Sequence, residues 1–175
     1  MSTIIIIIGL LIAFVLITAI LIGNKMEIER SVSINKPLDH VFDYLKFVRN
    51  QDNFSVWNMQ DPDMKKDFRG TDGTEGFVYG WNSKNKNVGA GEQEIKSIVK
   101  GENIDYEIRF FRPMANVAKA SFVFKPVTAD QTVVQWGFYS KMKLPMNIMK
   151  PIFQRMLGKD LAKSLENLRV ILEKQ

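Results

Sequence analysis

The side chains best suited to chemistry in this chain are aromatic and recur at every second position of short apolar runs. Tyr79 with Trp81 forms one such pair, and Tyr106 with Ile108 forms another. Alternation with a period of two is typical of a half-buried strand, so each pair shares one face of a sheet. The whole set is Tyr79, Trp81, Tyr106, Ile108, Phe122, Trp136 and Phe138, with Phe153 and Leu157 on a C-terminal segment. Such side chains either line a cavity for an apolar ligand or fill the core.

One polar side chain has the same phase as these aromatic residues. Gln93 is in step with Gly91 and Ile95, so its amide is directed to one side of the predicted sheet. An amide in an apolar cavity orients a ligand by hydrogen bonding. The alternative is an amide exposed at the edge of the sheet, which is the commoner environment for glutamine. Both interpretations stay open at this point.

No recognisable catalytic or metal-binding motif is present in the sequence. His40 is the single histidine, there is no cysteine, and we expect His40 to be exposed on a helix. Asp61, Asp63 and Asp67 lack the spacing and the final glutamate of a calcium-binding loop. Neither a glycine-rich phosphate loop nor a nucleophile elbow occurs. We therefore predict no metal and no cofactor, and assign no catalytic residue.

The acidic residues of the predicted strands alternate outward, away from the aromatic face. They are Glu92, Glu94, Asp105 and Glu107. Tyr79 and Tyr106 are then the only proton donors that a cavity on the inner face would contain. A cyclase-like or hydrolase-like reaction would depend on these two hydroxyls.

The periodicity of the sequence predicts the elements that position these residues. Residues 26–34 alternate as a strand, and residues 37–48 have helical spacing after Asn35, which offers a capping side chain. Residues 53–60 have no clean period and form a short helix or a packed loop. From Lys65, about six short strands are separated by turn residues, as in an antiparallel meander. Residues 149–172 carry the apolar stripe of one long amphipathic helix.

Four stretches of the soluble part mark positions in a fold rather than in a catalytic site. They are Ile34-Asn35-Lys36-Pro37 followed by Val41-Phe42-Asp43-Tyr44-Leu45, Gly89-Ala90-Gly91-Glu92-Gln93-Glu94-Ile95, Val134-Gln135-Trp136-Gly137-Phe138, and the closing helix. In these stretches, residues 26–175 resemble the START-like, or SRPBCC, superfamily, in its polyketide cyclase/dehydrase and lipid transport branch. The resemblance implies an α+β helix-grip fold, in which a curved antiparallel sheet of about seven strands surrounds a long C-terminal helix. It also implies a cavity between sheet and helix, although members range from lipid carriers to cyclases and chaperone co-factors.

The chain begins with an apolar stretch long enough to cross a membrane. Ile4 to Ile22 contains no charged side chain and would form a helix of about 28 Å, against roughly 30 Å of hydrocarbon. A cleaved signal peptide is the alternative, but Met1-Ser2-Thr3 supplies no basic side chain and residues 18–23 are a poor cleavage site. We predict a transmembrane anchor in residues 1–24, with the lipid bilayer as its partner, and a START-like domain in residues 25–175.

The residues that follow the apolar stretch predict where the domain lies. Lys25, Arg30 and Lys36 place it in the cytoplasm of a single-pass membrane protein by the positive-inside rule. A tether of about four residues, 23–26, holds it against the headgroups. A later basic stretch either contacts anionic lipid or is merely solvated. It comprises Lys141, Lys143, Lys150, Arg155, Lys159 and Lys163. The apolar loop 113–117 dips into a membrane, gates a cavity mouth or packs against the sheet.

The net charge of +5 does not by itself predict a nucleic-acid partner. Basic and acidic residues are interspersed, and the aromatic residues have inward phases, so we predict no nucleic acid. Three functions remain. The first is binding or transport of an apolar small molecule, such as a lipid, a quinone or an isoprenoid, taken from the bilayer. The second is an enzyme that uses the cavity tyrosines. The third is an interaction module in which side chains fill the space between sheet and helix and the exposed surface binds a partner.

Overall fold

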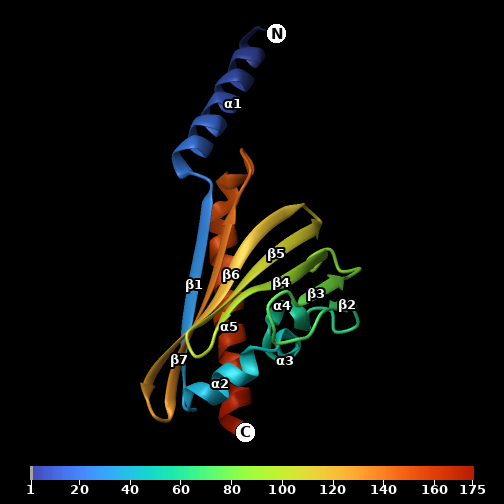
Figure 1. Cartoon of the computed structure of the whole chain (residues 1–175). Coiled ribbons are helices and arrows are strands. Elements are labelled where there is room, and N and C mark those ends of the chain that lie inside the picture. Colours follow the sequence, from blue (N-terminus) through green and yellow to red (C-terminus); the bar gives the residue numbers. More distant parts are fainter. Residues whose placement is uncertain (1) are drawn as a thin grey trace.

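The computed structural model describes residues 2–175 and contains one sheet wrapped around a long C-terminal helix (Figure 1). The elements are α1 (Ser2–Ile22), β1 (Lys25–Ile34), α2 (Leu38–Leu45), α3 (Gln51–Phe54), α4 (Val56–Met59), β2 (Lys65–Arg69), β3 (Val78–Asn82), β4 (Ala90–Val99), β5 (Asn103–Arg112), β6 (Asn116–Thr128), β7 (Gln131–Lys141) and α5 (Lys150–Lys174). The short 3₁₀ helices η1 (Val48–Asn50) and η2 (Met146–Met149) precede α3 and α5. The predicted α+β helix-grip architecture is confirmed.

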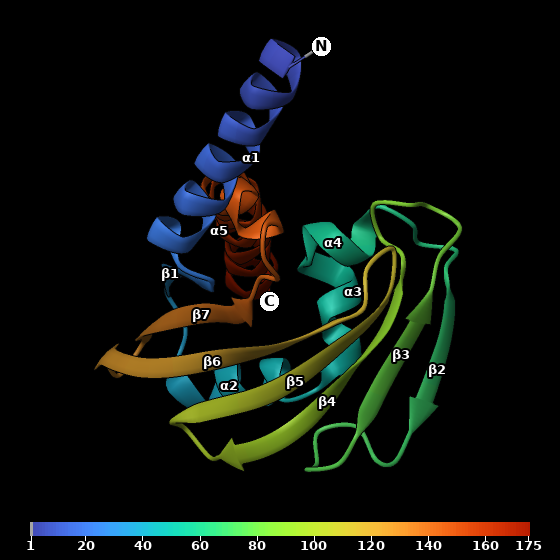
Figure 2. The ribbon, with the colours of Figure 1, turned by 90° about the horizontal axis from the view of Figure 1, so that it is seen from above.

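The seven strands form one antiparallel sheet in the order β1-β7-β6-β5-β4-β3-β2. Figure 2, which looks from above, shows the sheet curving around the helices. Burial alternates along β5, where Ile104, Tyr106 and Ile108 are buried and the residues between them are partly exposed. This is the period of two predicted for a strand with one face toward the core. Because β1 pairs with β7, the first and last strands of the domain are neighbours.

Two features near the start of the domain differ from their predictions. The first domain helix, α2, covers Leu38–Leu45 rather than 37–48, and Asn35 does not cap it. Asn35 instead accepts a hydrogen bond at Oδ1 from Nε2 of Gln131, at 2.9 Å. Pro37 is the N-cap residue, and no side chain bonds to the helix end. Residues 53–60, for which a helix or a loop was open, contain parts of two short helices, α3 and α4.

The solid core lies between the sheet and the C-terminal half of α5. Leu165, Leu168 and Leu172 are each at most 1% exposed, and they belong to one buried cluster with Phe122 and Ile34. Their spacing of three or four residues puts them on one face of the helix, which explains why this stripe was visible in the sequence. The predicted long C-terminal helix is therefore confirmed, and its second half closes one end of the grip.

The N-terminal helix α1 projects from the opposite end of the domain (Figure 1). By length and composition Thr3–Ile22 could cross a membrane, and only 6% of its apolar window is buried. The helix is thus not part of the protein core. The predicted four-residue tether is wrong, because β1 begins at Lys25 and leaves only Gly23 and Asn24 as a connection. Gly23 has φ of 69°, the left-handed conformation that commonly ends a helix.

Side chains of the domain bond directly to the end of α1. Nδ2 of Asn147, which is fully buried, donates to the carbonyl oxygens of Ala19 (2.5 Å) and Gly23 (3.1 Å). Nζ of Lys150 donates to the carbonyl oxygen of Ile22 at 2.8 Å. These bonds satisfy carbonyls that a helix end leaves unpaired, and the lysine charge suits the negative end of the helix dipole. Helix α1 is consequently held to the domain by hydrogen bonds and not only by the two-residue connection.

Candidate functional site

A pocket of about 570 Å³ lies between the concave face of the sheet and the first half of α5. Its walls come from the inner faces of β3 to β7, from α3 and α4, and from α5. Most of the wall is apolar, and the volume falls within the roughly 300–1,000 Å³ typical of small-molecule sites. Exposed residues line it at loop 112–115 and along residues 141–146, and also at Gln60, Lys86, Asn87 and Met156. Loop 112–115 and residues 141–146 therefore border the mouth of the pocket together with the end of α4 and the β3–β4 loop.

Eight of the ten residues predicted to bind a ligand line this pocket. They are Tyr79, Trp81, Gln93, Ile108, Trp136, Phe138, Phe153 and Leu157. Tyr106 and Phe122 do not line it, and both are at most 2% exposed. Phe122 packs against Trp136 with ring centroids 4.7 Å apart, and Tyr106 meets Phe122 edge to face. These two residues belong to the solid core, although they have the same phase as their neighbours on the strands.

Gln93 is on the pocket wall rather than at a sheet edge. Its strand β4 lies between β3 and β5, so the edge-exposed alternative is wrong. Two residues away, Gly91 faces Trp81 across the β3–β4 pair. A Cβ at Gly91 would come within 2.7 Å of Cζ2 of Trp81 and 2.5 Å of the carbonyl oxygen of Arg109. Only glycine at position 91 leaves room for the indole of Trp81 against the sheet.

Tyr79 is the only one of the four tyrosines that lines the pocket, and its hydroxyl is engaged. It donates to Oδ1 of Asp52 at 2.6 Å, and Asn58 donates to the same oxygen. Nζ of Lys66 donates to the other oxygen of Asp52 at 2.7 Å. Burial, together with the hydrogen bond to Asp52, raises the pKa of Tyr79 above its ordinary value. Tyr79 therefore keeps its proton and acts as a fixed hydrogen-bonding group.

Several polar pocket residues have no counterpart in the sequence-based prediction, and three of them lie where α3 and α5 meet the pocket. Gln51, on α3, is 5% exposed, and its Nε2 atom has no hydrogen-bond partner among the described residues. Asp160, on α5, forms no ion pair within residues 2–175, and burial raises the pKa of its carboxyl. Ser164 accepts from the backbone N–H of Val56 and donates to the carbonyl oxygen of Asp160. A single polar residue on a helix looks the same in the sequence whether it faces solvent or a cavity, so these three could not be predicted.

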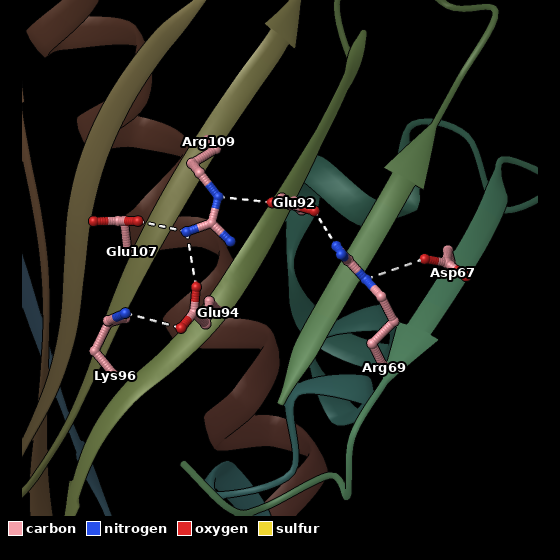
Figure 3. A network of polar contacts seen from close by, with 7 residues as sticks. All are labelled: Asp67, Arg69, Glu92, Glu94, Lys96, Glu107 and Arg109. Carbon is pink, nitrogen blue, oxygen red and sulfur yellow. Dashed lines mark hydrogen bonds and ion pairs between the residues drawn. The ribbon is translucent and has the colours of Figure 1, made fainter. Parts of the chain in front are cut away.

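The outer face of the same strands carries a network of charges (Figure 3). Arg109 lies at its centre and donates to Glu92 (2.7 Å), Glu94 (2.8 Å) and Glu107 (2.5 Å). Burial alone would raise the pKa of Glu92, but the hydrogen bonds from Arg109 and Arg69 outweigh it and lower that pKa. The prediction that the acids of these strands alternate outward is confirmed for these three glutamates. These three glutamates are ion-paired on the outer face of the sheet, so they place no charge in the pocket wall.

Other candidate residues lie away from the pocket. His40 is exposed on α2, as predicted. Asp61 accepts a hydrogen bond from the hydroxyl of Ser83. Within residues 2–175, no cluster of three or more His, Cys, Asp or Glu side chains could hold a metal ion. Loop 113–115, by contrast, lines the pocket, and Met114 is 52% exposed, so the alternative in which this loop packs against the sheet is wrong; Asn116 and Val117 of the predicted loop belong to β6.

No family model and no curated protein matches this sequence. Solved structures do match in fold. The aromatase/cyclase Zhui from Streptomyces sp. R1128 has a TM-score of 0.63 at 11% identity, over 86% of this chain and 94% of that chain. The di-domain ARO/CYC StfQ from the steffimycin biosynthetic pathway has a TM-score of 0.64 at 12% identity, over 86% of this chain and 52% of that chain.

A third match comes from a different kind of protein. The Aha1 dimer from Colwellia psychrerythraea has a TM-score of 0.58 at 14% identity, over 84% of this chain and 96% of that chain. At sequence identities this low, a structural match shows a shared backbone fold but not a shared functional site. The three likenesses establish that residues after α1 have the helix-grip fold.

Proposed function

We propose that this chain is a membrane-anchored domain that binds or carries an apolar small molecule between its sheet and its C-terminal helix. The observation that carries the proposal is the pocket of about 570 Å³, whose wall surface is mostly apolar. Apolar surface that opens to water is costly, so a pocket of this kind is stabilised by an apolar occupant. Lipids, quinones and isoprenoid-like molecules have the required character.

The membrane part of the proposal rests on α1. Its apolar stretch is long enough to span, and it is almost entirely exposed outside the domain. Exposed apolar surface on this scale is unfavourable in water and favourable in hydrocarbon. Lys25, Arg30 and Lys36 follow the span directly, which favours a cytoplasmic position for the domain.

Binding accounts for the pocket better than catalysis does. Tyr106 has no access to the pocket, which leaves Tyr79 as the one tyrosine of the cyclase-like hypothesis. The proton of Tyr79 is already donated to Asp52, and a raised pKa makes the phenol a weaker acid. The interaction-module hypothesis assumed a grip packed solid, and the open pocket removes that premise.

The three tryptophans of the chain, Trp57, Trp81 and Trp136, all line the pocket, so their fluorescence reports on its occupancy. The test uses the full chain in lipid nanodiscs, titrated with a fatty acid brominated on its acyl chain. Saturable quenching is expected, and extraction followed by mass spectrometry should recover an apolar compound from the freshly purified protein. Quenching that rises linearly without saturation, with no compound recovered, would refute the proposal.

A matched pair of variants on α5 separates pocket binding from partition into the lipid. Leu157→Phe adds volume inside the pocket and is expected to weaken probe binding about tenfold, because overpacked sites exclude ligand. Val170→Phe adds the same ring to an exposed position of the same helix, away from the pocket, and should leave binding unchanged. Equal affinities for the two variants would show that the probe does not enter the pocket.

A further inference from the structure

The mouth of the pocket and the end of the anchor helix are parts of one connected structure. The backbone N–H of Met142 donates to the carbonyl oxygen of Asn24 at 2.9 Å, one residue before β1. Asn147 and Lys150 bond to the last carbonyls of α1. Residues 141–146 supply part of the pocket wall. The segment that borders the mouth is therefore continuous in sequence with the residues that hold α1.

The other side of the mouth is tied to this segment. Nδ2 of Asn116, which follows the loop with Met114, donates to Oγ of Ser140 at 2.9 Å. Figure 1 shows that η2 and the start of α5 lie beside the end of α1, whereas the C-terminus lies at the far end of the molecule. If α1 spans a bilayer, both segments lie at the end of the domain that faces this bilayer.

The surface around the mouth has the composition of a lipid-facing surface. Five exposed apolar side chains, which we name the rim, belong to the two segments and the start of α5: Met114, Leu144, Met146, Met149 and Ile152. Residues 141–159 carry five Lys or Arg side chains and neither Asp nor Glu. Apolar side chains mixed with basic ones favour the headgroup region of a bilayer that contains anionic lipid.

We infer that the rim is immersed in the headgroup region of the bilayer that holds α1, so that the pocket opens onto lipid rather than onto water. The inference rests on the proposed function and adds to it the surface by which the domain docks and the route by which an apolar molecule enters. The hydrogen bonds of Asn147 to the end of α1 orient the mouth of the pocket relative to the bilayer. With the rim in the headgroup region, an apolar molecule can pass from the acyl chains to the pocket without crossing water.

The chain contains no cysteine, so a single introduced thiol can be labelled without background. Leu144→Cys and Ile152→Cys place a bimane fluorophore on the rim at positions that are 59% and 60% exposed and do not line the main pocket. Val127→Cys is the matched control, because Val127 is 55% exposed near the β6–β7 turn. That turn lies about 30 Å from the anchor along the paired strands β1 and β7.

The full-length labelled proteins are reconstituted into vesicles of phosphatidylcholine and phosphatidylglycerol that contain a headgroup-level nitroxide lipid. Both rim labels should be quenched at least about threefold more than the label at position 127, as expected for residues in the interface. Quenching at positions 144 and 152 that equals quenching at position 127 would overturn the inference. The measurement needs no ligand, so it can fail or succeed independently of the probe titration that tests the pocket.

A kinetic measurement tests the entry route without a label. The double variant Leu144→Glu with Ile152→Glu places charges on the rim, outside the pocket wall. Transfer of the brominated fatty acid from the vesicles should become about tenfold slower, while its equilibrium affinity stays unchanged, because anionic lipid repels the introduced carboxylates. An unchanged transfer rate would contradict entry through the rim. Loss of binding at equilibrium would do so as well, since it would assign these residues to the pocket.

Discussion

The two halves of α5 face the same sheet but have opposite surroundings. The C-terminal half presents Leu165, Leu168 and Leu172 to a core without space, whereas the N-terminal half presents Phe153 and Leu157 to a pocket. The backbone of α5 lies mainly along β1, and its helical neighbours are α3, α4 and η2, whereas the backbones of the central strands are farther away. Side chains fill the intervening space in one half and leave it open in the other.

The difference teaches that a shared face of a strand does not imply a shared role. Tyr106 and Ile108 alternate on β5 with the same phase, yet Tyr106 is sealed in the core and Ile108 lines the pocket. Two residues along a strand correspond to about 6.6 Å, which is enough to move from the closed to the open half. The following predictions test whether the halves differ in energy as they do in geometry.

The largest effect is expected in the closed half. Leu168→Ala should lower the free energy of unfolding by about 3 kcal/mol, because the site is completely buried and a cavity would remain. Leu157→Ala, the matched change in the open half, should cost about 1 kcal/mol or less, since the side chain already borders empty volume. Denaturant unfolding of the full chain in one detergent, followed by circular dichroism, measures both. Equal losses would remove the distinction between the halves.

The two tyrosines provide a second comparison of intermediate size. Tyr106→Phe deletes a buried hydroxyl that has no partner among residues 2–175, so stability should stay the same or rise by about 1 kcal/mol. Tyr79→Phe deletes the donor to Asp52 and should lower stability by about 1 kcal/mol. Thermal unfolding measured side by side gives the sign of each change. A loss for Tyr106→Phe would reveal a hydrogen bond to water in the closed half.

Asp160 should make the open half sensitive to pH. Burial raises the pKa of its carboxyl in the folded protein, so ionisation destabilises the fold, and this penalty appears as pH rises through the folded pKa. Asp160→Asn should therefore raise the melting temperature near neutral pH by about 2 °C, and the gain should vanish in acid below the unfolded pKa of about 3.9. Melting curves across this pH range test the sign. A gain that persists in acid would assign the effect to packing instead.

The outer network should give the smallest effect and serves as a baseline for both halves. Arg109 and Arg69 lower the pKa of Glu92, so this carboxylate stabilises the fold above its unfolded pKa of about 4.3, and the contribution is lost as pH falls. Solvent screens the network, so Arg109→Gln should change stability at neutral pH by about 1 kcal/mol or less. The variant should also flatten the acid limb of the stability curve. Lys125→Gln, outside the network, is the control and should leave that limb unchanged.

The sequence alone determined the class of fold and the separation of an apolar N-terminal helix from the rest of the chain. Period-two alternation, turn residues and the leucine stripe of α5 are local signals, because each depends on residues a few positions apart. For the same reason the outward direction of Glu92 and Glu94 could be predicted from their phase. The apolar wall of the pocket was likewise visible, in that eight of ten predicted residues line it.

Only the tertiary structure decided which part of the inner face is open. The distance of α5 from each strand separates Tyr106 from Tyr79. That distance depends on contacts between residues more than 100 positions apart, such as the hydrogen bond that the backbone N–H of Val56 donates to Ser164. The same long-range geometry brings Gln51 and Asp160 into the pocket and Asn147 to the end of α1. Phase along a strand is set by neighbouring residues, but free volume is set by all the elements around it.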